Sequence, residues 1–390
     1  MAEVLIVAGE PSGDAIGAEL VDAARRVAPT VHFFGAVGPA LESAGAEHVV
    51  ATREITALGL VEVVPRLPAI RRAMRRLERA AADRQTIGAI LIDSPDFNLR
   101  LARKLGRRSV PVVQYVSPTV WGWRPGRVAT IEKRVRRVLL TLPFEAEFYR
   151  DSRVDAVYVG HPALDRIPTD LGSRESVATR FGLTASRRWV ALLPGSRAGE
   201  LARMGPLLAE TATRLRQQVP DIELMTMVAP GLDPSAITTA LAGVAGLKLV
   251  ETDRHIALGH CDAAIATSGT VSLELALLGV PHVVAYRLSN ITFAIAKRMA
   301  RVRWIALPNL IADRAIIPEL IQRDAQPRQL AEPVIEWLEN DDARAAIRQE
   351  LQRVSQTLGP PGVAERAARA ALSAFGIYVE SLPPATDTSV

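Results

Sequence analysis

Residues 263–281 read AAIATSGTVSLELALLGVP, and this stretch decides the fold. The apolar run Ala263–Ala266 predicts the end of a buried strand, and the small polar residues Thr267–Gly269 predict a tight turn. A Ser or Thr in front of the apolar-rich run Thr270–Leu278 is typical of a helix N-cap, and the glycine and proline that follow the run are stop signals. We therefore predict a strand, a tight turn and a helix.

The start of this helix is a candidate phosphate site. The first backbone amides of a helix have no partner within it, so Ser268, Gly269 and Thr270 can present N–H groups to an anion. Glu274 follows one turn later in an otherwise apolar segment, and a lone carboxylate there can accept both hydroxyls of a ribose. The alternative is that Glu274 lies on a solvated helix face behind a capped turn.

The length and composition favour a two-domain globular protein. The chain has 390 residues, more than one ordinary core holds, with 48% hydrophobic and 23% charged residues. Its apolar runs are too short to span a bilayer, and Met1–Glu3 leads straight into the strand-like run VLIVA, so neither a transmembrane helix nor a signal peptide is expected. The single Cys261 excludes an internal disulfide and is expected to be a small core residue.

Basic residues are concentrated between Arg66 and Arg108, where 12 of them face only 4 acidic residues. Such an excess favours nucleic acid, an anionic membrane or a phosphorylated substrate. The run from Thr56 to Ala82 interleaves apolar residues with arginines, and a helix that starts near Pro68 would be amphipathic. Such a helix normally faces its own core, but the arginines also fit an interfacial element on lipid. The candidate membrane contacts are Val63, Val64, Leu67, Ile70, Arg71, Met74 and Arg75.

The first half opens with a strand, a loop and a helix in VLIVAGEPSGDAIGAELVDAARR, which predicts a doubly wound α/β domain. The loop is neither a GxGxxG dinucleotide motif nor a P-loop. It places polar groups at the carboxyl end of a first strand, where such folds bind ligands, or else they cap the helix. The candidates are Glu10, Ser12, Gly13 and Asp14.

A second strand, loop and helix follow in AILIDSPDFNLRLARKLG. Asp93 and Asp96 flank a proline at the carboxyl end of this strand, and Asn98 lies near the helix start. Either carboxylate can act as a general base if its surroundings tune its pKa. The structural alternative is that Asp96 caps the helix.

The second half contains LLPGSR, a strand followed by a glycine turn that ends in a cation. The guanidinium of Arg197 suits a diphosphate, because its fork pairs two phosphate oxygens and stays charged, so Gly195, Ser196 and Arg197 are candidate donor-site residues. Asn309 is expected in a loop at the end of a strand in WIALPNLIA. His255 and His260 have no third ligand at metal spacing, so no structural zinc is predicted.

Nine motifs, in this order and spacing, resemble lipid-A-disaccharide synthase: GEPSGD, DSPDFNLRLA, YVSPTVWGWRPGR, LPFEAEFY, VGHPALD, LLPGSR, SGTVSLELALLGVP, VAYR and LPNLIADRAIIPEL. The resemblance covers nearly the whole chain, from Val4 to about Leu372. The resemblance implies two Rossmann-like domains facing a cleft, the GT-B architecture. It also implies an inverting transfer from UDP-2,3-diacylglucosamine to 2,3-diacylglucosamine 1-phosphate, which gives a β-1,6-linked disaccharide and UDP.

Such a transfer needs a base and a group that stabilises the departing UDP. Asp96 is the expected base, with Asp93 and Glu10 as rivals. No Asp-x-Asp motif is present, so Arg197 and the amides of residues 268–270 are expected to replace a metal at the diphosphate, and no cofactor is predicted. Glu274 is expected to hold the ribose and Asn309 to contact the nucleotide or the sugar.

The expected domains are an acceptor-binding, membrane-facing domain (1–165), a linker (166–175), a UDP-sugar domain (176–358), a helix that packs back on the first domain (359–378) and a disordered tail (379–390). Because both substrates are acylated, the enzyme is expected in the cytoplasm on the anionic inner-membrane surface, without nucleic acid. A homodimer stays open.

Three other functions are weighed. A UDP-N-acetylglucosamine 2-epimerase or another lipid-linked transferase shares the architecture, but the long loops around Asp96 and Asn309 argue against both. An NAD-dependent dehydrogenase needs GxGxxG with a downstream acid, which neither half contains. A catalytically inactive membrane module is disfavoured because Asp96, Arg197 and Glu274 are all present.

Overall fold

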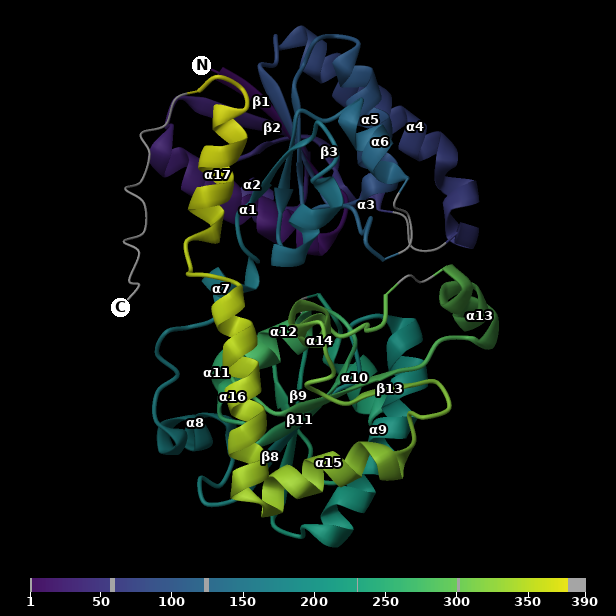
Figure 1. The fold of residues 1–390 in the computed structure, drawn as a ribbon, viewed down its shortest axis with the longest axis vertical. Coiled ribbons are helices and arrows are strands. Elements are labelled where there is room, and N and C mark those ends of the chain that lie inside the picture. The colour runs from purple at the N-terminus through teal and green to yellow at the C-terminus, as the bar shows by residue number, and fades with distance from the viewer. Residues whose placement is uncertain (1, 57–59, 123–125, 230, 300–301, 378–390) are drawn as a thin grey trace. The chain divides into compact units, whose positions relative to one another are not determined.

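The computed structural model describes residues 2–56, 60–122, 126–229, 231–299 and 302–377, without the side chains of residues 60–65, 290, 291, 295, 296 and 299. The chain forms two compact units (Figure 1). Unit 1 comprises 1–162 and 360–390, and unit 2 comprises 163–359. The segment 166–175, expected as a linker, lies within unit 2.

Unit 1 is built on a seven-stranded parallel sheet in the order β3-β2-β1-β4-β5-β6-β7. Its central strand β1 reads as a continuous apolar run and is buried from Val4 to Ala8, as expected for a parallel strand covered on both faces. The strands are β1 (Ala2–Ala8), β2 (Val31–Val37), β3 (Glu47–Ala51), β4 (Gly88–Ile92), β5 (Val112–Tyr115), β6 (Arg137–Leu140) and β7 (Asp155–Tyr158). The helices are α1 (Pro11–Val27), α2 (Pro39–Ser43), α3 (Thr52–Ile55), α4 (Leu60–Asp83), α5 (Pro95–Gly106), α6 (Arg127–Glu132), the 3₁₀ helix η1 (Pro143–Tyr149) and α17 (Val363–Ser373).

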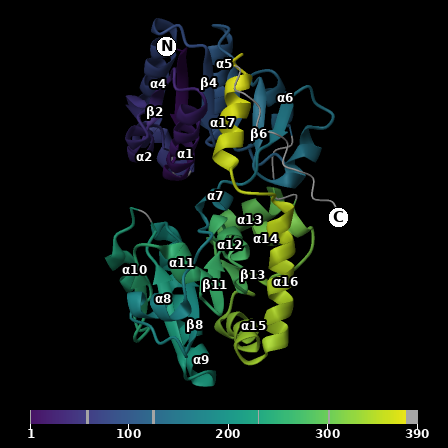
Figure 2. The same ribbon diagram turned by 90° about the vertical axis from the view of Figure 1, so that its left-hand side faces the viewer.

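Unit 2 repeats this plan with a six-stranded parallel sheet in the order β10-β9-β8-β11-β12-β13. The strands are β8 (Arg188–Leu193), β9 (Ile222–Met227), β10 (Lys248–Val250), β11 (Ala263–Thr267), β12 (His282–Tyr286) and β13 (Glu319–Ile321). The helices are α7 (Ala163–Arg166), α8 (Arg174–Phe181), α9 (Ala198–Gln218), α10 (Pro234–Ala240), α11 (Arg254–Gly259), α12 (Thr270–Leu277), α13 (Asn290–Met299), α14 (Leu307–Ala312), α15 (Pro327–Glu339) and α16 (Asp341–Thr357). The prediction of doubly wound parallel α/β domains is confirmed, and Figure 2 gives the side view.

In each unit the strand order reverses at one point, between β1 and β4 in unit 1 and between β8 and β11 in unit 2. In open α/β sheets, ligands bind outside the carboxyl ends of the strands at such a switch point. The fold therefore places the loops after β1, β4, β8 and β11 where a ligand is expected.

The C-terminal helix α17 belongs to unit 1, where it packs against α1 and β6 (Figure 1). Arg137 of β6 donates to the carbonyl of Ala370 at 2.6 Å and to the hydroxyl of Ser373 at 2.7 Å. Behind the helix, a Cβ on Gly88 would lie 2.3 Å from the Phe375 ring, so that position of β4 requires glycine. The last turn of the helix is thus held by both packing and hydrogen bonds.

The helix α4 has one core face, and this overturns part of the predicted membrane surface. Met74 is 8% exposed within the core of unit 1, beside Leu77, and Ile70 packs against the same cluster. Both were expected to contact lipid, but the helical spacing turns them inward with Leu77. Leu67 is half-buried, whereas Arg71 and Arg75 are exposed. The side chains of Val63 and Val64 lie outside the described residues.

Among the described residues, no helix is both long and apolar enough to cross a membrane.

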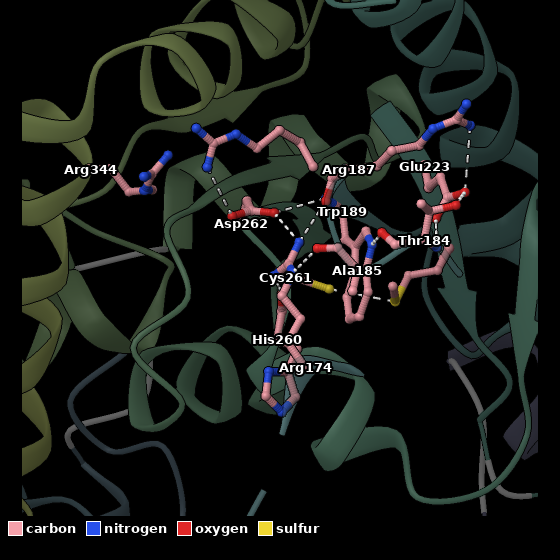
Figure 3. Close-up of polar contacts among 12 residues, drawn as sticks. Arg174, Thr184, Ala185, Arg187, Trp189, Glu223, His260, Cys261, Asp262 and Arg344 are labelled. Atoms are coloured by element: carbon pink, nitrogen blue, oxygen red, sulfur yellow. Dashed lines mark hydrogen bonds and ion pairs between the residues drawn. The ribbon is translucent and has the colours of Figure 1, made fainter. Parts of the chain in front are cut away.

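The amino ends of β8 and β11 are joined by the carboxylate of Asp262 (Figure 3). It accepts hydrogen bonds at 2.9 Å from the backbone N–H of Trp189 and from Arg174, whose guanidinium lies 4.0 Å from the centre of the Trp189 ring. Cys261 is fully buried beside this group, and burial raises the pKa of its thiol, with the charge of Asp262 adding to the shift. The prediction that Cys261 is a core residue is confirmed.

Candidate active site

In unit 1 the loops after β1 and β4 meet at close range. A Cβ on Gly9 would lie 2.1 Å from the hydroxyl oxygen of Ser94, so only glycine lets these two loops approach each other. The carbonyl of Gly9 also accepts a hydrogen bond from Thr56 at 2.8 Å. The two predicted groups of acceptor-side residues, around Glu10 and around Asp93, therefore lie side by side.

The turn after β4 is strained and is held by buried amide side chains. Asp93 and Ser94 have φ angles of +49° and +37°, the left-handed region that non-glycine residues seldom occupy. Asn98, fully buried, donates from Nδ2 to the carbonyls of Ile92 at 3.0 Å and Asp93 at 2.6 Å. Gln114 of β5 donates to the carbonyl of Asp93 at 3.1 Å. Asn98 thus stabilises the turn, and its place on the acceptor side stays a prediction.

Asp96 leaves this turn on the first turn of α5 with its side chain 70% exposed. The N-cap of α5 is Ser94, without a side-chain cap, so Asp96 is not the cap that the structural alternative required. Arg127, at the start of α6, lies 2.5 Å from Asp96 Oδ1 and is itself only 11% exposed. The sequence analysis did not single out Arg127, although this residue ends the GWRPGR motif. The reason is that its partner Asp96 lies 31 residues away in the sequence, so the pairing is a tertiary contact.

The GEPSGD loop divides into exposed and structural residues. Asp14 is buried, and its carboxylate accepts from the amides of Gly38, Ala40 and Leu41 at 2.7, 2.9 and 3.3 Å. It holds the amides at the start of α2, the capping role that the alternative gave it at another helix, and its part in acceptor binding stays a prediction. Gly13 is buried as well, whereas Ser12 is exposed and Glu10, the N-cap of α1, is half-buried.

In unit 2 a glutamate holds the turn that carries Arg197. Glu200 Oε2 accepts from the amides of Ser196 at 3.1 Å and Arg197 at 3.3 Å. Gly195 has a φ of +106°, and a Cβ there would lie 2.5 Å from the same oxygen. The amide of Ser196 therefore serves the turn. The guanidinium of Arg197 lies 3.8 Å from Glu200 Oε1, and its side chain is 62% exposed.

The helix α12 begins beside this turn, because Leu193 of β8 pairs with Ala266 of β11. Its N-cap is Gly269, without a side-chain cap. The Ser or Thr N-cap predicted for this helix is therefore wrong, since the hydroxyl of Ser268 donates instead to the carbonyl of Ile305 at 3.2 Å. Gly269 has a φ of +149°, and a Cβ built on it would have no neighbour within 4 Å. A helix start without a side-chain cap suits an anion, which can take the place of a capping oxygen.

Glu274 lies one turn further along α12 and is 6% exposed, so the solvated-face alternative is wrong. Its carboxylate lies 3.4 Å from Arg254 Nη2 and 3.3 Å from His255 Nε2. Burial alone would raise the pKa of Glu274, but His255, Arg254 and Arg166 outweigh it, and the net shift is downward. Glu274 is therefore an ionised acceptor held at the edge of the turn.

A pocket of about 370 Å³ opens next to this carboxylate. Arg254 and His255, which both contact Glu274, also line this pocket. Its lining residues are Arg166, Pro168, Val228, Glu251, Asp253, Arg254, His255 and Ile256. The volume is within the range of small-molecule sites, and the loops after β9 and β10 supply several of its walls. Sequence reasoning did not identify this pocket.

Asn309 makes structural hydrogen bonds, and its contact with the nucleotide or the sugar stays a prediction. It lies on α14, not in a loop after a strand, and is fully buried. Its Nδ2 donates to the carbonyl of Ile317 and to Glu319 at 2.9 and 2.8 Å, and its Oδ1 accepts from the amides of Ile316 and Ile317 at 2.9 and 3.0 Å. These four bonds use its whole donor and acceptor capacity.

Replacing Asn309 tests this role. Asn309→Ala leaves four polar groups without their Asn309 partner, and the two that belong to Ile317 are buried. An unsatisfied buried group costs roughly 1–3 kcal/mol, so we expect a loss of unfolding free energy on the order of 3 kcal/mol. Urea unfolding measures it. A fully stable variant with a raised KM for the UDP-sugar would instead restore Asn309 to the binding site.

Comparison with known proteins identifies relatives of this arrangement. A family model described as lipid-A-disaccharide synthetase matches residues 4–374. The lipid-A-disaccharide synthase of Anaeromyxobacter dehalogenans (strain 2CP-C) is 43% identical over 372 residues, covering 95% of this chain and 97% of that protein. The synthases of Myxococcus xanthus and Geobacter sulfurreducens are 42% and 41% identical over 98% and 96% of this chain, and over 98% of their own lengths.

Solved structures share the fold at low sequence identity. A putative UDP-N-acetylglucosamine 2-epimerase from Listeria monocytogenes matches with a TM-score of 0.65 at 14% identity over 96% of both chains. MurG of Acinetobacter baumannii matches with a TM-score of 0.58 at 14% identity, over 96% of this chain and 100% of that one. At such identities the likeness shows the fold alone, the two-domain GT-B architecture.

Proposed function

The chain belongs to the lipid-A-disaccharide synthase family, and we propose how its residues carry out the transfer. It is a hexosyltransferase of lipid A biosynthesis whose substrates are acylated glucosamines. One observation carries the assignment of roles: in both units an exposed charged residue that the sequence singled out lies at the start of the helix that follows a strand at the topological switch point. These residues are Asp96 after β4 and Arg197 after β8.

The proposed donor site is in unit 2. The diphosphate of the UDP-sugar binds the backbone amides at the start of α12, with Arg197 as its cation. The ribose hydroxyls donate to the ionised Glu274, and the adjoining 370 Å³ pocket receives the base. Arg254 and His255 hold the Glu274 carboxylate in place, so the ribose acceptor is oriented before the nucleotide arrives.

The proposed base is Asp96 of unit 1. The acceptor's 6-hydroxyl oxygen attacks C1 of the donor, Asp96 takes the hydroxyl proton, and the bond from C1 to the phosphate oxygen breaks with its electrons leaving on UDP. Because attack and departure are on opposite faces of the sugar, the α-linked donor gives a β-linked product. Arg127 pairs with the Asp96 carboxylate and orients it, and the high exposure of Asp96 leaves room for a substrate hydroxyl.

The departing UDP is stabilised by Arg197 and the α12 amides rather than by a divalent cation. Two features support this: the guanidinium supplies charge at the turn, and the chain has no Asp-x-Asp motif.

The test uses purified protein, the two acylated glucosamine substrates and EDTA. We expect disaccharide and UDP in equal amounts at an unchanged rate with the chelator. Loss of turnover restored by Mg²⁺ would reject the metal-free route, and conversion of UDP-N-acetylglucosamine to its 2-epimer would reject the transferase.

The acylated substrates place the reaction at a membrane surface, and we propose that the exposed side of α4 contacts anionic lipid. Arg71 and Arg75 point away from the core face that contains Met74 and Leu77. A basic helix face next to half-buried apolar residues is the pattern of an interfacial helix.

Two matched variants separate surface from core. Leu67→Ser is expected to weaken sedimentation with anionic liposomes and to leave the unfolding free energy nearly unchanged, because Leu67 is only half-buried. Met74→Ala is expected to lower it by about 2–5 kcal/mol and to leave liposome binding of the folded protein intact. The opposite pattern in either variant would contradict the division of α4 into a lipid face and a core face.

A further inference from the structure

The motif VAYR covers residues 284–287, and its tyrosine, Tyr286, is the last residue of strand β12. The residue before it, Ala285, pairs with Thr267 at the end of β11. Tyr286 therefore lies at the carboxyl edge of the unit 2 sheet, next to the turn that leads from β11 into α12.

The backbone around Tyr286 is held by the segment that follows β13. The carbonyl of Tyr286 accepts from the amide of Gln322 at 2.9 Å, and the side chain of Gln322 in turn accepts from the amide of Leu288 at 2.6 Å. Arg287 donates to the carbonyl of Ala325. A side chain on a backbone fixed in this way is positioned before a ligand arrives.

The side chain of Tyr286 reaches across the end of β11. Its hydroxyl donates to Oε1 of Glu200 at 3.5 Å, and Glu200 belongs to α9, the helix that follows β8. In the sheet, β11 lies between β8 and β12. The tyrosine therefore spans the end of the strand from which residues 268–270 lead into α12.

Glu200 brings the Tyr286 hydroxyl and the Arg197 guanidinium to one oxygen atom. Arg197 Nη1 lies 3.8 Å from Oε1, whereas Oε2 holds the turn by accepting from the amides of Ser196 and Arg197. Both contacts with Oε1 are longer than the roughly 2.8 Å of a strong hydrogen bond. A phosphate oxygen can therefore replace Oε1 as the acceptor without loosening the turn, because the turn depends on Oε2.

The half-buried hydroxyl of Tyr286 is a neutral donor. Burial raises the pKa of Tyr286, and the charge of Glu200 adds to the shift, against the opposing effect of Arg197 and Arg203. The phenol therefore keeps its proton at neutral pH and can donate it in a hydrogen bond to a phosphate oxygen.

We propose that Tyr286 is a further catalytic residue of the transfer: its hydroxyl donates a hydrogen bond to the diphosphate of the UDP-sugar, beside Arg197. This rests on the proposed donor site in unit 2. The bond strengthens as negative charge develops on the departing UDP, so it lowers the barrier to the breaking of the bond from C1 to the phosphate oxygen. No proton is transferred to UDP in this step, because the hydroxyl keeps its O–H bond.

Binding of UDP and of uridine to Tyr286→Phe, measured by titration calorimetry, tests the contact with phosphate. We expect the Kd for UDP to rise about 10–100-fold, which is typical of a lost hydrogen bond to a charged group, and the Kd for uridine to stay unchanged, because uridine has no phosphate. Arg197→Ala should show the same selectivity. The matched control is Tyr158→Phe, which removes another half-buried phenol hydroxyl, on β7 of unit 1.

The outcomes separate this contact from the donor site itself. An unchanged Kd for UDP in Tyr286→Phe, together with a raised one in Arg197→Ala, would overturn the role of Tyr286 and leave the donor site in place. Equal losses of UDP and uridine affinity would also overturn it, since the hydroxyl would then only shape the site. If neither variant changed the Kd for UDP, the proposed donor site would itself be rejected.

Turnover tests the catalytic part of the proposal. In Tyr286→Phe we expect kcat at saturating substrates to fall about 10–100-fold. A thermal melt should match the wild type, because phenylalanine keeps the ring and only the long bond to Glu200 is lost. A wild-type kcat with a raised KM for the UDP-sugar would overturn the catalytic role, since the hydroxyl would then bind the ground state and the transition state equally.

Discussion

Asp96→Asn is expected to lower kcat by about 10²–10⁴-fold, the usual contribution of a positioned general base. The amide keeps the size of the side chain but cannot accept the proton of the acceptor hydroxyl. Stability should change little, because Asp96 is 70% exposed and its pair with Arg127 contributes only modestly at such a surface. Steady-state turnover with both acylated substrates, together with a thermal melt, measures the two effects.

Asp151→Asn is the matched control for this variant, since Asp151 is an exposed carboxylate of the same unit, in the turn before β7. Near-wild-type turnover of Asp96→Asn would move the base elsewhere. The next candidates would then be Asp93 and Glu10, which the close approach of Gly9 to Ser94 places beside it.

Arg197→Ala is expected to reduce kcat by about 10²–10³-fold, the typical cost of losing one charged donor to a developing anion. The protein should remain folded, because the guanidinium is 62% exposed and lies 3.8 Å from Glu200 on the same turn. Arg197→Lys should recover part of the loss, since an ammonium keeps the charge but not the two-pronged geometry.

Arg203→Ala, on the exposed side of the same helix, is the control for Arg197. The value of kcat distinguishes two roles of Arg197. If Arg197 only attracted the UDP-sugar in the ground state, its loss would raise KM and leave kcat unchanged. A wild-type kcat in Arg197→Ala would show that the leaving group is stabilised by other residues.

The sequence predicted the local elements of the site well, because the residues that determine each strand, turn and helix are neighbours in the sequence. The stretch 263–281 indicated strand, turn and helix from its apolar runs and its glycine, and β11 and α12 are found there. Glu274 was identified as an isolated carboxylate on an apolar helix, and the structure adds its burial and its partners Arg254 and His255.

What escaped prediction depends on partners distant in the chain. Asp14 serves amides of α2 more than 20 residues away, and Asn309 and Glu319 join α14 to β13. The pairing of Arg127 with Asp96 and of Glu145 with Trp121 is likewise tertiary. Polar residues of this kind look alike in a sequence whether they bind a substrate or hold a turn, because only their partners distinguish the two roles.

The amphipathic pattern of α4 was ambiguous for a related reason. Ile70 and Met74 have the same apolar character whether they face lipid or the sheet, and the packing against Leu77 decides for the core. Arg71 and Arg75, which must avoid that core, remain the residues from which a lipid surface can be argued.

A crystal structure with UDP tests the central claim most directly. We expect the diphosphate at the first turn of α12, within hydrogen-bonding distance of the backbone amides of residues 268–270 and of the Arg197 guanidinium, with the ribose hydroxyls on Glu274. A nucleotide bound away from Arg197 and Glu274 would contradict the account.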